Sequence, residues 1–202
     1  MMRSIGGIVG LGAIALAVSL TGGKTQTTRP VPNTASVFTD LGGPSCKEYI
    51  DQTDPNSTPY TACPGAFEFS LIIRHVGSGR QSIDIVTPTQ QVYPLDYHDY
   101  VTRQMSHLGD EAEWRIADRD GQKWPVAVIV PVHVHENMDE PERVSRSYFV
   151  LAKISPSDIC VTQKIPAGSM SRARMLETAD SAPEQDCLDP LPAKTVDGDR
   201  PR

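Results

Sequence analysis

The sequence lacks the short motifs that mark common nucleotide-dependent and hydrolytic enzymes. Its 202 residues contain no glycine-rich phosphate loop, no dinucleotide fingerprint, no Gly-x-Ser-x-Gly elbow and no internal repeat. No basic patch stands out, and 25 Asp and Glu residues outnumber 19 Lys and Arg residues, for a formal net charge of −6. We therefore expect no nucleic-acid partner, no anionic-lipid partner and no bound cofactor.

The apolar run near the N-terminus is too short to span a bilayer comfortably. Arg3 is the one charged residue before Lys24, and residues 5–20 between them are rich in Gly, Ala, Val, Ile and Leu. A charged start, a core shorter than about 20 residues and small residues behind it are the layout of a signal peptide. We predict that residues 1–22 are a signal peptide, with no stable membrane insertion after its cleavage. An uncleaved membrane anchor is the alternative.

The two ends of the remaining chain have little to bury. Residues 23–35 form a polar stretch with two prolines, and residues 190–202 form a charged stretch punctuated by prolines. We expect a flexible polar linker and a disordered tail, respectively. A single domain then occupies residues 36–189, which is long enough for a substantial hydrophobic core.

The middle of this domain alternates apolar and polar residues at the period of β-strands. Turn signals such as Asp120-Gly121 separate the runs, and consecutive strands joined by short turns form an antiparallel meander. Pro125 and Pro131 put one strand at a sheet edge or at a bulge, because proline cannot donate a ladder hydrogen bond. In the first run, four apolar residues are predicted to share one face: Phe67, Phe69, Leu71 and Ile73. The predicted strands span residues 67–74, 82–86, 113–116, 124–135, 143–154 and 159–165.

One helix is predicted after the last strand, over residues 169–181. Ser169 is placed to cap its N-terminus and Pro183 to stop it. Its predicted apolar stripe consists of Met170, Ala173, Leu176 and Ala179. The expected fold class is α+β, mainly an antiparallel β meander with this C-terminal helix packed on it.

Four cysteines indicate an oxidising compartment and two disulfides. Four cysteines allow three connectivities. We favour Cys46–Cys63 and Cys160–Cys187, because each pair is close in sequence and the second would hold the helix to the strand before it. The absence of a Cys-x-x-Cys motif counts against the alternative of a redox or metal site.

A tyrosine cluster marks the stretch between the second and third predicted strands. Residues 87–108 read as a long loop or a short helix, and long loops in compact domains are often functional. Tyr93, Tyr97 and Tyr100 therefore form a candidate contact surface. The alternative is that these tyrosines cover the core with their hydroxyls in water.

Two histidines form the sharpest candidate for a metal site. His133 and His135 lie two positions apart on a predicted strand, so both imidazoles would point the same way, and Glu140 follows. This His-x-His-x-x-x-x-Glu spacing resembles the first metal motif of cupin barrels. The second cupin motif is missing, because no histidine follows His135. Nothing in the pattern selects a third ligand, whether His75, His98 or His107, so two exposed histidines at a strand end are the preferred interpretation.

The order of features between residues 36 and 188 resembles a family of uncharacterised exported proteins of alphaproteobacteria. The segments that carry this resemblance are Val37-Phe38-Thr39-Asp40-Leu41, Ala62-Cys63-Pro64-Gly65, Glu113-Trp114-Arg115, residues 125–129, residues 149–153, Cys160-Val161, Ala173-Arg174 and the last cysteine. The resemblance implies a bacterial periplasmic or secreted protein with this disulfide pattern, and it implies no activity.

Three classes of function remain open. The favoured class is a non-catalytic binding or accessory protein of the cell envelope, which contacts a partner protein or a wall component through a strand edge or the tyrosine loop. The second is a metal-dependent exported enzyme that uses His133 and His135. The third is a periplasmic inhibitor of a wall-cleaving enzyme.

Overall fold

The computed structural model describes residues 34–50, 52–53, 57–77, 79–119, 121–137 and 139–192. The predicted signal peptide, residues 23–33 of the predicted linker and residues 193–202 of the predicted tail lie outside this part of the chain. Thr34 and Ala35, expected in the linker, begin the first strand. Leu191, expected in the tail, donates its N–H to the Asp99 carbonyl at 2.6 Å.

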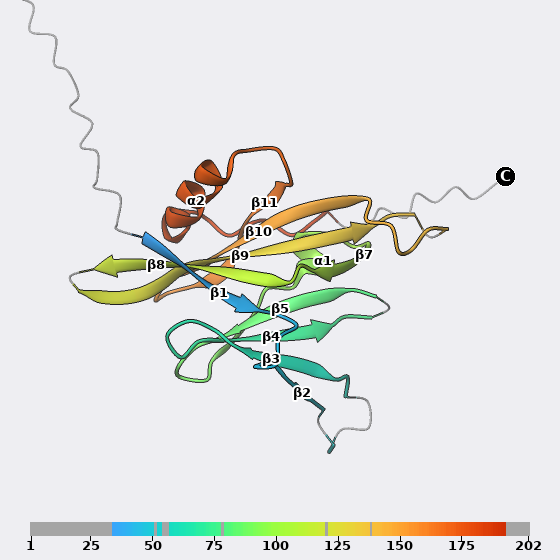
Figure 1. Cartoon of the computed structure of the whole chain (residues 1–202), viewed down its shortest axis with the longest axis horizontal. Coiled ribbons are helices and arrows are strands. Elements are labelled where there is room, and N and C mark those ends of the chain that lie inside the picture. The colour runs from blue at the N-terminus through green and yellow to red at the C-terminus, as the bar shows by residue number, and fades with distance from the viewer. Residues whose placement is uncertain are drawn as a thin grey trace, which may run out of the picture. The chain divides into compact units, whose positions relative to one another are not determined.

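The predicted antiparallel meander is confirmed, and it is divided between two sheets (Figure 1). The smaller sheet has five strands in sequence order, β2-β3-β4-β5-β6. The larger sheet has the order β1-β8-β9-β10-β11, and β7 pairs with the far half of β9. The strands of the smaller sheet are β2 (Lys47–Tyr49), β3 (Tyr60–Pro64), β4 (Ser70–His75), β5 (Gln81–Val86) and β6 (Val92–Pro94). Those of the larger sheet are β1 (Thr34–Asp40), β7 (Met105–Leu108), β8 (Glu111–Arg119), β9 (Gln122–His135), β10 (Arg146–Ile154) and β11 (Ile159–Pro166).

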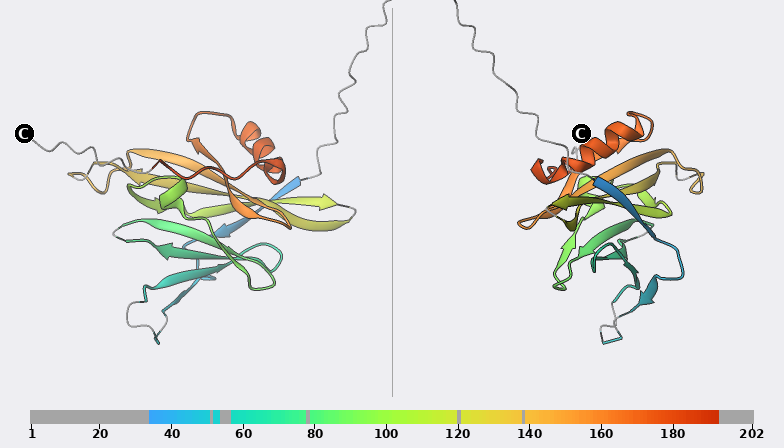
Figure 2. Two further views of the ribbon diagram at one scale, coloured as in Figure 1. Left: turned by 180° about the vertical axis from the view of Figure 1, so that it is seen from behind. Right: turned by 60° about the vertical axis from the view of Figure 1, so that its left-hand side comes forward.

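The two sheets bury one core between them, and the main helix covers the other face of the larger sheet (Figure 2). The buried residues of the core include Leu71, Ile73, Ile83 and Ile85 from the smaller sheet and Trp114, Val128, Val130, Val132 and Val150 from the larger. The helical elements are α1 (Tyr97–Tyr100), α2 (Arg172–Asp180) and the 3-10 turn η1 (Ala182–Glu184). No helix in the described ranges is both long and apolar enough to cross a membrane.

Trp114 ties the first strand to this core. Its side chain is fully buried and its indole N–H donates to the Thr39 hydroxyl at 2.9 Å. The same hydroxyl lies 3.0 Å from the Pro64 carbonyl, to which it donates. Gly65 lies against the indole, where an added Cβ would come within 2.5 Å of the ring. One contact therefore links β1, β8 and the end of β3.

Helix α2 begins later than predicted. Ser171, and not Ser169, is the N-cap, and its hydroxyl accepts the Arg174 N–H. The buried residues of α2 are Met175 and Ala179, and Ala182 of η1 is buried beside them, so the predicted apolar stripe is confirmed at Ala179 and wrong at Met170 and Ala173, which are exposed. Three of the five residues after Ser169 are polar or charged, and contact with the sheet buries Met175 instead of the adjacent Leu176.

The first predicted strand also begins later, because residues 66–69 form a tight turn. Phe67 and Glu68 both have positive φ, at 50° and 66°, and the Phe69 N–H closes the turn onto the Ala66 carbonyl at 3.1 Å. Phe67 is 44% exposed, so its predicted place on the buried face is wrong. Leu71 and Ile73 are buried as predicted.

The strand with two prolines is bulged as predicted, but it lies inside its sheet. Arg115 pairs with Ala127 and Ile116 with Pro125, so Val126 is an extra residue on β9. Pro131 falls where the neighbour of β9 changes from β8 to β7, and its carbonyl accepts the Gly109 N–H on that side. The N–H that proline lacks is therefore not needed, and an internal strand accommodates it.

Both predicted disulfides are confirmed. Cys46 and Cys63 are bonded across 17 positions, at the junction of β1, β2 and β3. Cys160 and Cys187 are bonded across 27 positions and join β11 to the chain that follows α2 and η1. Each disulfide joins two cysteines that are close in the sequence, which is the reason this pairing was predicted.

Candidate functional site

Three of the five histidines, His107, His133 and His135, form a row on the outer face of the larger sheet, which points away from the core between the sheets. His107 on β7 lies opposite His133 on β9, and its ring centroid is 5.1 Å from that of His133 and 4.9 Å from that of His135. Nδ1 of His107 lies 2.8 Å from Nε2 of His135, and Nδ1 of His133 lies 2.8 Å from the Ser147 hydroxyl. Desolvation by burial, and then the charges of the other two histidines, lower the pKa of His107.

The histidine row does not present a ready metal site with Glu140. That carboxylate lies on an exposed turn and pairs with Arg143 at 3.1 Å. Within the described ranges, the one group of three side chains with ligand atoms within 4.8 Å of one another is Asp158, Cys160 and Cys187. Its two sulfurs are joined as a disulfide, and a disulfide supplies no thiolate ligand.

The predicted tyrosine surface is wrong at its centre. Tyr97 on α1 is 1% exposed and belongs to the core, and its hydroxyl has no hydrogen-bond partner among the described residues. Burial raises its pKa. Tyr93 and Tyr100 are partly buried and pack against the same core. The three side chains therefore do not share one exposed surface.

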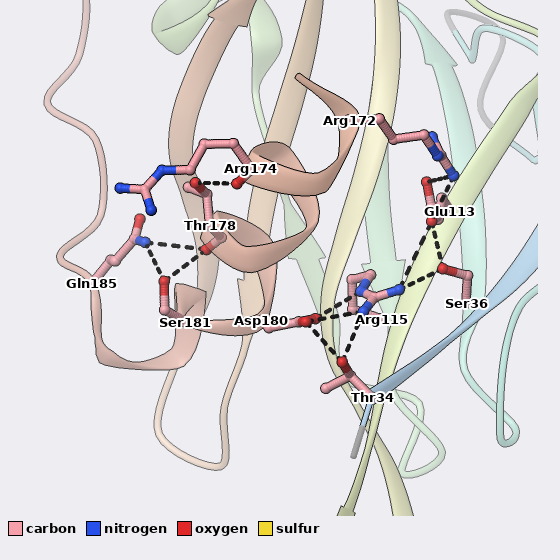
Figure 3. Close-up of polar contacts among 10 residues, drawn as sticks. All are labelled: Thr34, Ser36, Glu113, Arg115, Arg172, Arg174, Thr178, Asp180, Ser181 and Gln185. Carbon is pink, nitrogen blue, oxygen red and sulfur yellow. Dashed lines mark hydrogen bonds and ion pairs between the residues drawn. The ribbon is translucent and has the colours of Figure 1, made fainter. Parts of the chain in front are cut away.

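The densest polar network fastens α2 to the larger sheet (Figure 3). Arg115 on β8 donates to both carboxylate oxygens of Asp180 at 2.7 and 2.9 Å, and the two side chains are 6% and 9% exposed. Glu113, two positions away, accepts two bonds from Arg172 at the other end of the helix, at 3.0 and 2.9 Å. Thr34 and Ser36 on β1 bond to Arg115 as well. We call this network the helix clamp; since its members are bonded to one another, we interpret it as structural.

The free edges of the two sheets are protected to different degrees. Strands β2 and β6 have three residues each, β2 contains Lys47 and Glu48, and β6 ends in Pro94. Strand β11 is accompanied by the chain after η1, where the Leu188 N–H donates to the Val161 carbonyl at 2.7 Å. Short length, charge, proline and a covering segment are the usual protections against unwanted strand pairing.

Strand β1 has none of these protections along its first six residues. It pairs with β8 over seven positions in regular register, contains no proline and carries no charge before Asp40. No described residue pairs with its other edge. Val37 and Phe38 are 40% and 50% exposed. We call the unpaired side of Thr34–Asp40 the open edge.

The direction of the backbone groups on the open edge follows from one hydrogen bond. The Leu41 N–H donates to the Asp110 carbonyl at 2.7 Å, so Leu41 points its backbone groups toward the β8 side. Backbone groups alternate along an antiparallel ladder, so Val37 and Thr39 also point toward β8. The N–H and C=O groups of Ser36 and Phe38 therefore point outward, where they can pair with another strand.

A hollow lies on the inner face of the sheet beside this edge. Its volume is about 210 Å³. Ala35 and Val37 of β1 form one wall of this hollow, and Phe67, in the turn between β3 and β4, lines it from the other sheet.

The turn that holds Phe67 has positive φ at two central residues, a geometry that usually selects Asn-Gly. A left-handed conformation costs about 1–2 kcal/mol for a residue other than glycine. Backbone strain of this kind gathers at functional sites, so Phe67 is a candidate contact residue. The lining is completed by Ile116, Asp118 and Lys123.

A second depression lies on the outer face, on the other side of β1. Its volume is about 370 Å³, and Phe38 forms its rim next to the open edge. Asp110 and Glu111 line it and are exposed, and no described residue forms an ion pair with either. Arg172 also lines it but is bound to Glu113. The depression is therefore left with a net negative charge.

Comparisons with known protein families, with curated proteins and with solved structures find no match. The resemblance to exported alphaproteobacterial proteins therefore stays a prediction. The open edge was missed from the sequence, because strand exposure depends on which distant strand pairs with it. The uncharged run Thr34–Thr39 was the one local signal that could have drawn attention to it.

Proposed function

We propose that this chain is an exported, non-catalytic binding protein of the bacterial cell envelope, whose partner adds an extended strand to β1. The observation that carries the proposal is the open edge: seven paired residues with no charge before Asp40, no proline and no described neighbour on the free side. Main-chain hydrogen bonds to such an edge supply affinity, and adjoining hollows for side chains supply specificity.

The two disulfides support a location outside the cytoplasm, since structural disulfides persist in oxidising compartments. The periplasmic or secreted location within that range is part of the proposal. It rests on the predicted signal peptide in residues 1–22, which lies outside the described part of the chain.

A binding role is favoured over a metal-dependent enzyme by the bonds that the candidate ligands already make. His133 is bonded to Ser147, His135 to His107, and Glu140 to Arg143. Within the described ranges, these three side chains do not form a group whose ligand atoms lie within 4.8 Å of one another. Metal analysis of the native protein, with His133→Ala and His135→Ala as controls, decides between the two functions: a stoichiometric metal lost in both variants would favour the enzyme.

The open edge is tested by one substitution with a matched control. Phe38→Pro removes an N–H that points outward, so no hydrogen bond between β1 and β8 is lost. Phe38→Val removes the same ring and keeps the N–H. A photo-reactive benzoylphenylalanine at Phe67 reports whatever lies beside the edge in living cells. The same probe at Val92, which is 42% exposed on β6, is the control site.

We expect a discrete adduct from position 67 and none from position 92. The adduct should persist in Phe38→Val and disappear in Phe38→Pro, while both variants keep the thermal midpoint of the parent within about 2 °C, as expected for a surface change of a few tenths of a kcal/mol. An adduct that survives Phe38→Pro would overturn the proposed function.

A further inference from the structure

Resting on this proposed function, we infer that the open edge accepts an extended segment with a distinct residue pattern: large apolar side chains on one face and a basic side chain on the other. The two depressions beside β1 have opposite character, and the alternation of a strand directs neighbouring side chains into each of them.

The inner hollow selects the apolar side chain. In an added strand whose hydrogen-bonded pairs fall at Ser36 and Phe38, the residues opposite Ala35 and Val37 point toward the inner face. Ala35 is exposed and carries only a methyl group, so a large side chain opposite it can lean over β1 into the hollow. There it would meet Val37, Phe67 and the buried Ile116. The strained turn holds Phe67 in place as part of the lining of this hollow.

The outer depression selects the basic side chain. The residue opposite Phe38 points toward the outer face, where the Phe38 ring is half exposed and the Asp110 and Glu111 carboxylates lie behind it. A lysine or arginine there would contact the ring face and the carboxylates together, which combines a cation–π contact with charge attraction.

A second copy of this chain does not fit the pattern. Its own β1 contains no basic residue, and its one charge, Asp40, would add to the negative outer face. Its largest side chain on this strand, Phe38, points outward instead of toward the hollow. Its Thr39 is 6% exposed and bound to Trp114 and Pro64 inside its own copy. The occupant that matches the charge and the hollow is a segment of another protein.

The test uses labelled peptides and the full chain. The probe is Ac-TKVTLT-NH2, in which valine and leucine face the hollow and lysine faces Phe38. A second peptide, Ac-TEVTLT-NH2, reverses the charge, and a third, Ac-TKTVLT-NH2, contains the same residues as the probe in an order that places valine on the face of the lysine and so breaks the alternation. Fluorescence polarisation measures binding to the parent, to Phe38→Pro and Phe38→Val, and to Ala35→Trp, which fills the hollow.

We expect the lysine peptide to bind about tenfold more tightly than the glutamate peptide, because opposite charges replace like charges. Ala35→Trp and Phe38→Pro should abolish binding, and Phe38→Val should retain it with a reduced preference for lysine. Equal affinity for the lysine and glutamate peptides, both lost in Phe38→Pro, would overturn the inferred pattern and leave the proposed function standing.

Two further results would also overturn the inference. The first is no binding of the lysine peptide at about 1 mM, the weak limit for a specific contact. The second is a dimer of the chain that disappears in Phe38→Pro, because the occupant would then be a second copy. Peptide binding unaffected by Phe38→Pro would overturn the inference and the strand-addition function together.

Discussion

Removing Arg115 from the helix clamp should destabilise the domain strongly. Arg115→Met keeps most of the aliphatic side chain and deletes a guanidinium that is 6% exposed. Asp180, 9% exposed, would lose both charge-assisted bonds and keep only the Thr34 hydroxyl at 2.7 Å. Breaking a buried ion pair by removing one partner typically costs about 3–5 kcal/mol, because the other charge stays buried.

This loss is large against the usual stability of a domain, which is about 5–15 kcal/mol. At about 2–4 °C for each kcal/mol in a protein of this size, the thermal midpoint should fall by roughly 6–20 °C. Urea unfolding of the disulfide-bonded protein, followed by far-UV circular dichroism, measures the free energy of unfolding directly.

The matched control lies on the same helix. Arg174 pairs with Glu177 at 3.2 Å, but these side chains are 71% and 65% exposed, so Arg174→Met should cost no more than about 0.5 kcal/mol. Adding Asp180→Leu to Arg115→Met should recover most of the loss, because the buried pair is then replaced by apolar side chains. The reasoning is refuted if Arg115→Met and Arg174→Met unfold within 1 kcal/mol of each other, a margin set by typical surface substitutions.

Three shorter predictions test other parts of the fold. Tyr97→Phe removes a buried hydroxyl without a described partner, so the free energy of unfolding in urea should stay the same or rise by about 1 kcal/mol; a loss of more than about 1 kcal/mol would mean the hydroxyl is bonded. Replacing Cys160 and Cys187 by alanine opens a loop of 27 positions and should lower the unfolding free energy by about 3–4 kcal/mol in denaturant titrations. The pKa of His107 is lowered from 6.5 by burial, so the unfolded chain takes up protons first and stability should fall as the pH drops below about 6.5. His107→Gln should lose that part of the pH dependence in urea titrations, and an unchanged profile would contradict the assignment.

The parts of the fold that were predictable depend on neighbours in the sequence. The hairpin of β4 and β5 joins adjacent runs, and the disulfide Cys160–Cys187 closes around a single helix. The exact stripe of α2 was not predictable in this way. Met175 and Leu176 are both apolar and adjacent, and contact with the sheet decides that Met175 is the buried one.

The parts that were missed depend on contacts between distant segments. Nothing near His107 in the sequence indicates that β7 pairs with β9 and places that ring beside His133. The positive φ of Phe67 could not be expected from an apolar residue in an alternating run, since such turns favour Asn and Gly. The candidate site at β1 was missed for the same reason, because β1 becomes an edge strand through its pairing with the distant strand β8.

The pairing of β1 with β8 also sets an order of events during folding. Ser36 and Glu113, bonded across these strands, lie 77 positions apart, whereas the ladders from β8 to β11 and from β2 to β6 all join consecutive strands. Distant pairings close late, because the chain entropy of the intervening loop must be overcome first. Strand β1 should therefore pair with β8 last, so the edge of β8 stays unpaired during the earlier steps of folding. During that period β1 of one molecule can complete the sheet of another, so refolding at high concentration is expected to yield strand-exchanged dimers.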